Sequence, residues 1–462
     1  MKSMIWKPSI DTHFYKTLIA LAIPIALQNL VASSLNMIDT IMIGQLGHKE
    51  IAAVGLANQV FFLFNLFLFG INSGAAIFTA QYWGKNDLTN IHRVQGISLV
   101  SGLAVTLIFT GLSYAIPETL LRFFTADPNV IALGSGYLKI VAVSYIPTMV
   151  SFAYASVLRS TGQVILPLKI NGIAILSNTF LNYLLIYGNW GLPRLEVNGA
   201  AVATVIARLV ETAAILITVY RYNLVPAASW SQLTAFSASF VKKFFQTTIP
   251  VILNESLWAG GVTMYTAVYA RMGTEIIAAI NISATVERIA MVLFFGMAQA
   301  CAVMVGHKIG AGDNETAFRY AKRFSLLGPS IGIIITILLM ISIPWMLSFY
   351  QVDKDVLNLT AAIITIFAMT IPVRIFNLIL IVGILRSGGD TRFSLIIDTA
   401  GLWLIAVPLV FVSGLVWKFP AQWVYLMTAS EECFKFILGI IRLYSKRWIH
   451  NLTHPQLSSE QI

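Results

Sequence analysis

Charged residues are scarce in this sequence, and their scarcity excludes a soluble globular protein. Only 11% of the 462 residues are charged and 57% are hydrophobic, whereas soluble domains average about 25% charged residues. The mean hydropathy is +0.79. A water-soluble fold would lack the polar side chains to cover its surface, so the composition indicates a protein embedded in a lipid bilayer.

Other absences narrow the function. The two cysteines, Cys301 and Cys433, lie in apolar runs, so we expect no disulfide framework or CxxC site. Motifs for ATP hydrolysis, zinc peptidases and serine hydrolases are missing, so we expect no enzyme and no cofactor. The net charge is +10, but long basic runs with interleaved aromatics are absent, so nucleic acid is not an expected partner. The N-terminal region also lacks the pattern of a cleaved signal peptide.

What the sequence has in abundance is long apolar runs. Twelve runs reach the roughly 20 residues that a transmembrane helix needs. They span about 17–43, 51–80, 94–116, 130–155, 164–187, 197–220, 244–271, 277–306, 318–343, 356–385, 393–415 and 421–444. The longest polar connection separates the sixth run from the seventh. We therefore expect an N-terminal half over 1–222, a linker over 223–243, and a C-terminal half with a short tail over 244–462.

Lysine and arginine set the expected orientation. Outside the twelve runs they gather in alternate connections, on the side that holds both termini. By the positive-inside rule that side is cytoplasmic. We therefore expect a multi-pass protein of a bacterial inner membrane, with both termini and the linker in the cytoplasm, and we expect a monomer.

The two halves repeat each other at an offset of 226 residues. The matching pairs include Pro24 and Pro250, Gly47 and Gly273, Gly70 and Gly296, Gly84 and Gly310, Asp87 and Asp313, and Arg93 and Arg319. Six runs in each half give both halves the same topology, related by an axis along the membrane normal. The predicted fold is all-α, with twelve transmembrane helices in two pseudo-symmetric six-helix bundles and a cavity at their seam.

Acids inside the apolar runs are the candidate functional groups, because a charge at that depth costs roughly 3 kcal/mol and usually serves transport. Glu255 lies about three turns into its run, and Trp258 three residues later could offer an aromatic face to an organic cation. Asp39 follows Asn36 by one helical turn. Asn178 and Asn182 could complete a proton or cation site with Asp39.

Two further acids, Glu287 and Asp398, leave ion coupling and structural pairing open. Candidate substrate contacts are the large side chains expected near the seam, namely Phe61, Trp258, Tyr265, Met291 and Phe295. Asn58, Asn65 and Asn72 recur every seven residues on one helical face, where they could line a cavity or bond neighbouring helices.

Several motifs resemble the multidrug and toxic-compound extrusion (MATE) family, in its NorM-like branch, over nearly the whole chain. They are Pro24 with Met37-Ile-Asp39-Thr-Ile-Met-Ile-Gly44, Gln81-Tyr-Trp-Gly84, Leu158-Arg-Ser-Thr-Gly162, Pro250 with Glu255, Gly306-His-Lys-Ile-Gly310 and Leu385-Arg-Ser-Gly-Gly-Asp390. The resemblance implies a V-shaped pair of bundles that exports small cationic amphipathic drugs against an inward flow of Na+ or H+.

The sequence departs from the family pattern where some members carry an acid. The tenth run has none, with Asn377 the nearest polar candidate, and the fifth run has Asn178 and Asn182 instead. The choice between H+ and Na+ therefore stays open, as does a Na+ site at Asp39 or Glu255; no other metal is expected. The alternative function is a flippase-type exporter of lipid-linked oligosaccharides, whose cavity should be lined by Arg and Lys.

Overall fold

The structure of the protein is a computed structural model that describes residues 11–453, apart from the side chains of residues 34–37. Within that range the fold is helical and contains no strand. The first half comprises α1 (Thr12–Gly44), α2 (His48–Gly84), α3 (Leu88–Ala115), α4 (Pro117–Arg122), α5 (Pro128–Ala142), α6 (Tyr145–Ser160), α7 (Ile165–Tyr187) and α8 (Glu196–Arg221). A short helix, α9 (Trp230–Leu233), lies in the connection between the halves.

The second half begins with α10, which starts at Ala238, inside the region expected to be linker. Its helices are α10 (Ala238–Met272), α11 (Thr274–Gly310), α12 (Asn314–Leu347), α13 (Lys354–Leu378), α14 (Thr391–Ala400), α15 (Val407–Phe411), α16 (Ala421–Met427) and α17 (Ala429–Ser445). π-helical turns over Ile379–Leu385 extend α13, turns over Gly401–Ala406 join α14 to α15, and turns over Val412–Val416 extend α15.

These helices make up the twelve expected spans. In the described range nine helical segments are long and apolar enough to cross a membrane, and the pair α5 and α6 makes ten. The other two spans are α10 and the consecutive helices α16 and α17, which carry more polar side chains. The expected span 130–155 is not one straight helix, because α5 and α6 meet at a bend of 49°. Pro147 explains the bend, since it has no N–H to donate to the carbonyl of Val143.

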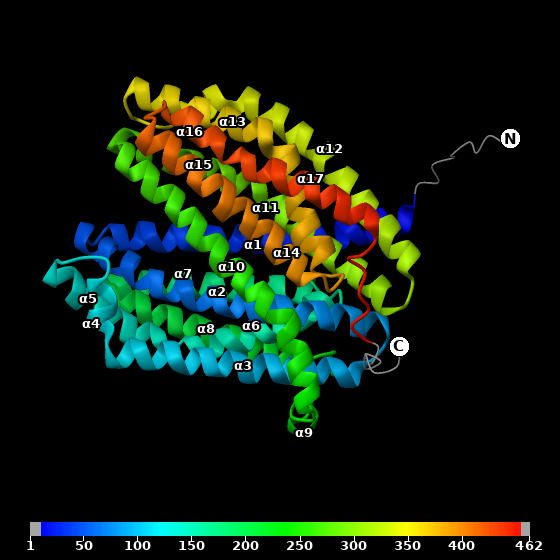
Figure 1. Ribbon diagram of the computed structural model, residues 1–462. Coiled ribbons are helices and arrows are strands. Elements are labelled where there is room, and N and C mark those ends of the chain that lie inside the picture. The colour runs from blue at the N-terminus through cyan, green and yellow to red at the C-terminus, as the bar shows by residue number, and fades with distance from the viewer. Residues whose placement is uncertain (1–10, 454–462) are drawn as a thin grey trace.

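The helices form two lobes, one from each half of the chain (Figure 1). The first helix of each half lies at the seam and packs on the second helix of the other half: α1 contacts α11, and α10 contacts α2. Glycines allow these close approaches. A Cβ on Gly70 of α2 would press on Ile252 of α10, and one on Gly296 of α11 would press on Ala22 of α1.

The repeat seen in the sequence is also a repeat in structure. Helices α2 (His48–Gly84) and α11 (Thr274–Gly310) occupy the same positions in their halves. Each is preceded by a glycine with a φ that other residues rarely adopt, +153° at Gly47 and +150° at Gly273. The equivalent aspartates Asp87 and Asp313 cap α3 and α12 by accepting a backbone N–H three residues on.

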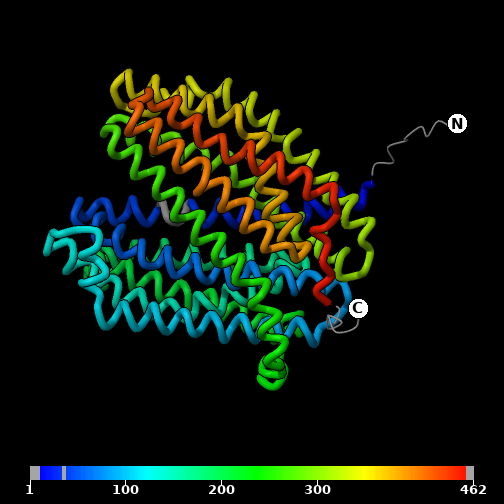
Figure 2. The backbone as a smooth tube through the Cα atoms, in the orientation of Figure 1, coloured from blue at the N-terminus to red at the C-terminus, as the bar shows by residue number. Residues whose placement is uncertain are grey.

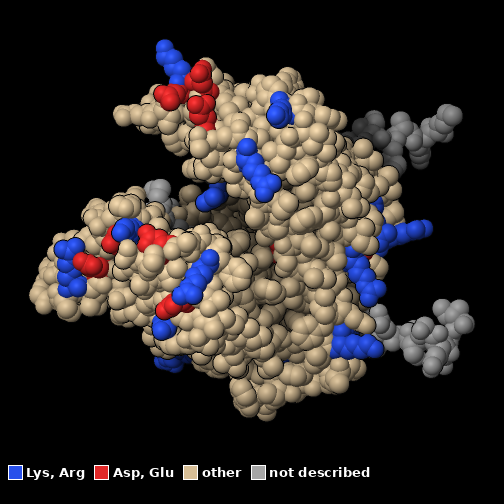
Figure 3. All heavy atoms as spheres, turned by 60° about the vertical axis from the view of Figure 1, so that its left-hand side comes forward, with Lys and Arg blue, Asp and Glu red and all other residues tan. Residues whose placement is uncertain are grey.

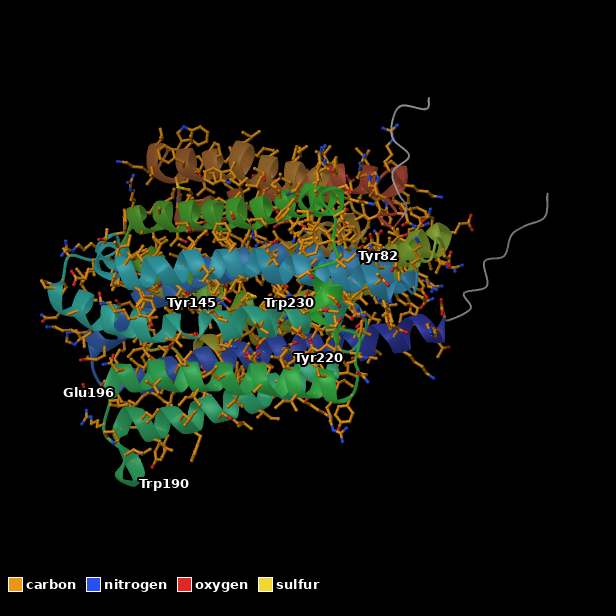
Figure 4. The ribbon with its side chains drawn as sticks, turned by 90° about the horizontal axis from the view of Figure 1, so that it is seen from below. Tyr82, Tyr145, Trp190, Glu196, Tyr220 and Trp230 are labelled. Atoms are coloured by element: carbon orange, nitrogen blue, oxygen red, sulfur yellow. The ribbon has the colours of Figure 1, made fainter. Side chains whose placement is uncertain are left out.

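Both ends of the described chain lie at one end of the helix bundle, which we call the terminal side (Figure 2). The connection that carries Trp190 and Glu196 lies at the opposite end (Figure 4). Seen obliquely from that opposite end, the surface is hollowed between the two lobes (Figure 3). The molecule therefore has a cleft that opens away from its termini.

Candidate functional site

A cavity of about 460 Å³ lies within the lobe of the first half. Helices α1, α2, α5, α7 and α8 supply its walls. This volume falls in the range of about 300–1,000 Å³ that is typical of small-molecule sites. The polar part of its lining consists of Asp39, Thr40, Asn58, Asn65, Tyr137, Asn171, Asn178, Thr204 and Arg208, and Phe61 and Phe62 add aromatic faces.

Asp39 is the acidic group of this cavity, and a chain of hydrogen bonds holds it. Asn182 donates from Nδ2 to Asp39 Oδ1 over 2.6 Å and to Asn178 Oδ1 over 3.1 Å. Asn178 in turn donates to Thr204 Oγ1 over 3.4 Å. The structure therefore brings three of the predicted ion-site residues together. The side chain of the fourth, Asn36, lies outside the described residues.

The charge of Asp39 is not neutralised by an ion pair within the described chain, since no basic nitrogen lies within 4.0 Å of its carboxylate. Arg208 also lines the cavity, but its Nη1 pairs with Glu211 Oε2 at 2.7 Å. The side-chain oxygen of Asn182 is buried without a hydrogen-bond donor. An ionised carboxylate beside a free amide oxygen can accept a proton or coordinate a small cation.

Glu255 lies in a different environment from the one we expected. Its Oε1 pairs with Arg386 Nη1 at 2.6 Å, and the side chains are only 16% and 4% exposed. Arg386 directly follows the expected span 356–385 and was therefore expected in a connection, so this partner was missed. The pair neutralises the charge of Glu255, whereas the carboxylate of Asp39 forms no ion pair within the described residues.

We expect Arg386→Gln to destabilise the protein by about 3–5 kcal/mol, because it leaves Glu255 buried without its cation. Adding Glu255→Gln should recover part of this loss, since no charge then remains buried. The thermal midpoint of monodispersity in detergent would measure both effects. Arg122→Gln is the matched control, because Arg122 pairs with Glu118 in an exposed bridge with side chains 67% and 62% accessible. Equal shifts for Arg386→Gln and the control would contradict the structural role of the pair.

The remaining predicted acids belong to a buried cluster in the lobe of the second half. Glu287 accepts a hydrogen bond from the Tyr425 hydroxyl. Asp398 pairs with Lys435 Nζ at 2.6 Å, and Lys435 also approaches Glu431 at 3.1 Å. Asp398 therefore has its cationic partner within helix α17 and not in a basic loop. Both acids already have partners in the protein, which favours structural pairing over ion coupling.

The five predicted substrate contacts do not form one surface. Phe61 lines the cavity and stacks on Tyr145 with ring centroids 5.6 Å apart. Trp258 and Phe295 are exposed, at 46% and 44%, on α10 and α11. Tyr265 is buried in the core of the second lobe, against which Met291 also packs. These side chains point from different helices in different directions, so Phe61 alone joins Asp39.

Several cavity residues were not singled out from the sequence. Tyr137, Asn171 and Thr204 are polar side chains in apolar runs, and nothing in the sequence connects them to Asp39. Arg208 lies one helical turn before Glu211, a spacing that predicts a structural pair, and the structure contains that pair. The seven-residue spacing on α2 did carry a signal, because Asn58 and Asn65 line the cavity. The third member of that series instead bonds a neighbouring helix, since Asn72 accepts from the Ser98 hydroxyl at 3.0 Å.

The two lobes meet on the terminal side through a reciprocal contact. A Cβ on Gly84 would overlap the His307 carbonyl, and a Cβ on Gly310 would overlap the Gln81 carbonyl. The side chains cross the seam in the same paired manner. Gln81 donates to the Ser387 carbonyl at 2.9 Å, and the His307 ring lies 2.7 Å from the Ser160 carbonyl. The repeat thus closes the terminal side with two equivalent copies of one contact.

A strap formed by residues 448–453 lies across the same closure. Gln81 bonds it twice, by donating to the His450 carbonyl at 3.1 Å and accepting from the Leu452 N–H at 2.7 Å. Asn451 donates to the Ile309 carbonyl at 2.9 Å, and Lys243 donates to the Leu452 carbonyl at 2.6 Å. The strap therefore connects the segment that follows α17 to both lobes.

A further link between the halves lies at the start of α1. Asp11 Oδ2 pairs with Arg323 Nη1 of α12 at 2.6 Å, and its Oδ1 accepts from the Phe14 N–H. The hydrogen bond from Arg323 is the main reason that the pKa of Asp11 lies below its ordinary value.

A two-lobed bundle of membrane-spanning helices, with a polar cavity inside one lobe and a cleft closed at one end, defines a multi-pass membrane transporter. The family comparison agrees: the MatE family model matches residues 24–184 and 250–412, one segment in each half. The chain belongs to the MatE family, which is a family of transporters and includes proteins named for multidrug resistance.

Relatives match over almost the full length. A probable multidrug resistance protein NorM of Thermotoga maritima is 23% identical over 94% of this chain and 93% of its own. A protein of the same name from Rhodopseudomonas palustris is 28% identical over 89% of this chain and 87% of its own. A mutant of the Vibrio cholerae MATE transporter VcmN superposes with a TM-score of 0.86 at 17% identity, covering 94% and 97% of the two chains. These structural matches confirm the predicted fold.

Proposed function

We propose that the protein is a secondary antiporter that exports organic cations in exchange for H+ or Na+. The observation that carries this proposal is Asp39, an acid without an ion pair in a cavity of about 460 Å³. Phe61 and Phe62 beside it offer aromatic faces for an organic cation. A carboxylate that is not already paired can exchange one cation for another.

The coupling ion would bind where Asp39 already has a hydrogen-bond donor. Asn182 donates to Oδ1, so a proton can sit on the other carboxylate oxygen without breaking that bond. For Na+, the oxygens of Asp39 and Asn182 would be the first ligands, with neutral oxygens such as Thr204 Oγ1 nearby. Both ions fit this set of donors. In the described chain, no group of three His, Cys, Asp or Glu side chains offers a site for another metal.

Transport would proceed by alternating access between the two lobes. The structure supports one of the two required states, with the cleft open away from the termini and the terminal side closed by its reciprocal contact. The abundance of Lys and Arg in the connections on the terminal side supports a cytoplasmic location for that side. We therefore place both termini in the cytoplasm of a bacterial cell, with the protein working as a monomer in the inner membrane.

Export of an anionic substrate, such as a lipid-linked oligosaccharide, is the second candidate, and one observation favours it. A pocket of about 90 Å³ at the seam is lined by Arg159 and by its repeat counterpart Arg386. Arg386 is neutralised by Glu255, whereas Arg159 forms no ion pair within the described residues. One uncompensated cation at the seam is a weaker signal than an unpaired acid in the larger cavity.

Reconstitution into liposomes tests both candidates. We expect uptake of a fluorescent cation such as ethidium to depend on an imposed H+ or Na+ gradient, and to stop when that gradient is collapsed by an ionophore. Comparing the two gradients separately identifies the coupling ion. Gradient-independent movement of ethidium would contradict antiport, and movement of an anionic lipid-linked sugar in place of ethidium would establish the second candidate.

A further inference from the structure

A groove of about 800 Å³ on the terminal side is separate from the cavity that holds Asp39. It lies between the beginnings of α1 and α7 and the end of α11. Lys16 and Lys169 stand at its edge, with Thr17, Gln163 and Thr218 among its polar side chains. Leu21, Ile165, Leu166 and Met304 make much of the rest of its wall apolar.

The two lysines are exposed and form no ion pair with another described residue. Each lies near the N-terminus of its helix, Lys16 in α1 and Lys169 in α7. The start of α7 lines the groove through Ile165 and Leu166, and the free N–H groups and dipole of that helix N-terminus add to the positive field there. Two uncompensated cations at adjoining helix starts create a site for a negatively charged group.

Each lysine also begins a stripe of exposed apolar side chains that runs toward the opposite side of the membrane. On α1 the stripe continues through Ile19, Ile23, Leu27 and Leu30, which are 56%, 46%, 45% and 42% exposed. On α7 it continues through Ile173, Leu176 and Phe180, which are 53%, 73% and 49% exposed.

The stripes lie on the outer faces of these helices. With 3.6 residues per turn, the stripe on α1 is opposite the face that carries Asp39 and Ile43. The stripe on α7 is likewise opposite Asn178 and Ala174, which line the inner cavity. The stripes therefore face away from the inner cavity, and an apolar occupant along them would remain in contact with lipid.

We propose that this groove binds one anionic phospholipid, with its phosphate between Lys16 and Lys169 and its acyl chains along the two stripes. A basic pocket between transmembrane helices at the cytoplasmic surface suits such a headgroup, because that leaflet carries anionic lipids. The proposal uses the cytoplasmic placement of the terminal side given above, but not the antiport activity. The charge of the phosphate should favour this ligand over neutral lipids, and the acyl chains should favour it over free anions.

Titration of the purified full-length protein with phosphatidylglycerol, followed by native mass spectrometry, tests the site. We expect one phosphatidylglycerol to bind more tightly than phosphatidylcholine with the same acyl chains. Removing both charges with Lys16→Gln and Lys169→Gln should weaken phosphatidylglycerol about thirty-fold, and about five-fold for each lysine alone. Lys16→Arg with Lys169→Arg should restore binding. Because the titration is done in detergent, neither membrane orientation nor transport enters the result.

The matched control removes two lysines of the terminal side that do not line the groove, Lys242→Gln and Lys322→Gln. It should leave the affinity within about two-fold, because surface substitutions away from a site have small effects. Equal affinity for the two lipids, or equal loss in the control and the groove variant, would overturn the proposal. So would phosphatidylglycerol binding that arises only after deletion of residues 2–10, since the groove would then belong to the chain's own N-terminal segment.

Discussion

Asp39→Asn is expected to abolish ion-coupled export while leaving the protein folded. The substitution keeps the size of the side chain and removes the carboxylate that accepts from Asn182. Asp39 forms no ion pair in the described chain, and Arg208, the cation of the same cavity, is paired with Glu211, so the substitution leaves no unpaired charge in the cavity. A membrane potential of 100 mV supplies about 2.3 kcal/mol for each net charge moved. That energy sustains roughly a fifty-fold drug gradient, and the variant should sustain none.

Uptake of ethidium into proteoliposomes measures this effect, and Asp127→Asn is the matched control. Asp127 caps α5 outside the cavity by accepting the Asn129 N–H at 2.9 Å, and Asn is an equally good cap. The control should transport at the parental rate. Parental accumulation by Asp39→Asn would show that this carboxylate does not couple transport.

Asn178→Ala and Asn182→Ala should each weaken export, because both belong to the hydrogen-bond chain of Asp39. Combined with each other and with Asp39→Asn, their effects should be strongly non-additive, as expected for residues of one site. Strictly additive effects across all pairs would argue for separate roles.

Gly84→Ala should prevent the terminal side from closing, and Gly310→Ala should do the same. Each new Cβ would overlap a backbone carbonyl of the other lobe, at His307 or Gln81, and a backbone cannot rotate away as a side chain can. The lobes must then separate at this end, so the population of the state with a closed terminal side and a cleft open away from the termini should fall. We expect export to fall at least ten-fold, which corresponds to about 1.4 kcal/mol.

Labelling would report the opening directly. A cysteine introduced by Ser160→Cys, at the seam pocket, should react faster with a membrane-impermeant maleimide when Gly84 is replaced. The exposed native Cys433 is first changed to Ser. Gly111→Ala is the control, because a Cβ at that helical glycine meets no atom within 4 Å. Equal labelling rates in the two glycine variants would refute a closed contact at Gly84.

A disulfide between the lobes at the same end should hold the terminal side closed, whereas Gly84→Ala should hold it open. Both changes should reduce export. Lys85→Cys and Lys308→Cys place thiols beside the reciprocal glycines Gly84 and Gly310. Once the link has formed, the terminal side cannot open, so export should stop and should return with reductant. Full transport with a verified link would contradict alternating access by movement of the lobes.

The repeat explains why so much of the fold could be predicted. An offset that aligns Gly47 with Gly273 and Asp87 with Asp313 aligns two helix starts in each half, and the structure places all four residues at those starts. Local backbone chemistry determines such positions, so a single sequence reveals them. The bend between α5 and α6 was missed, although Pro147 was visible as its local cause.

The part of the site that could be predicted rests on pairs of polar residues at helical spacing. Asn178 and Asn182 are one turn apart and share a helical face. Both belong to the hydrogen-bond chain that reaches Asp39 in the structure. The partner of Glu255 is 131 residues away, and the sequence has no periodicity that connects them. Tyr137 and Thr204 line the cavity because tertiary packing brings their helices together. The sequence around each residue therefore does not indicate that it lies in the cavity.

The strap has a consequence for how the transporter is made. The described helices of both lobes all precede Asn451 and Leu452 in the chain, so they are synthesised first. Domains generally fold from the N-terminus as they emerge, so each bundle can assemble while its end on the terminal side still lacks this cover. Gln81 can bond Leu452 only after residues 448–453 have been synthesised. A chain that stops after Ser445 would therefore have the described helices of both lobes and would lack this connection between them.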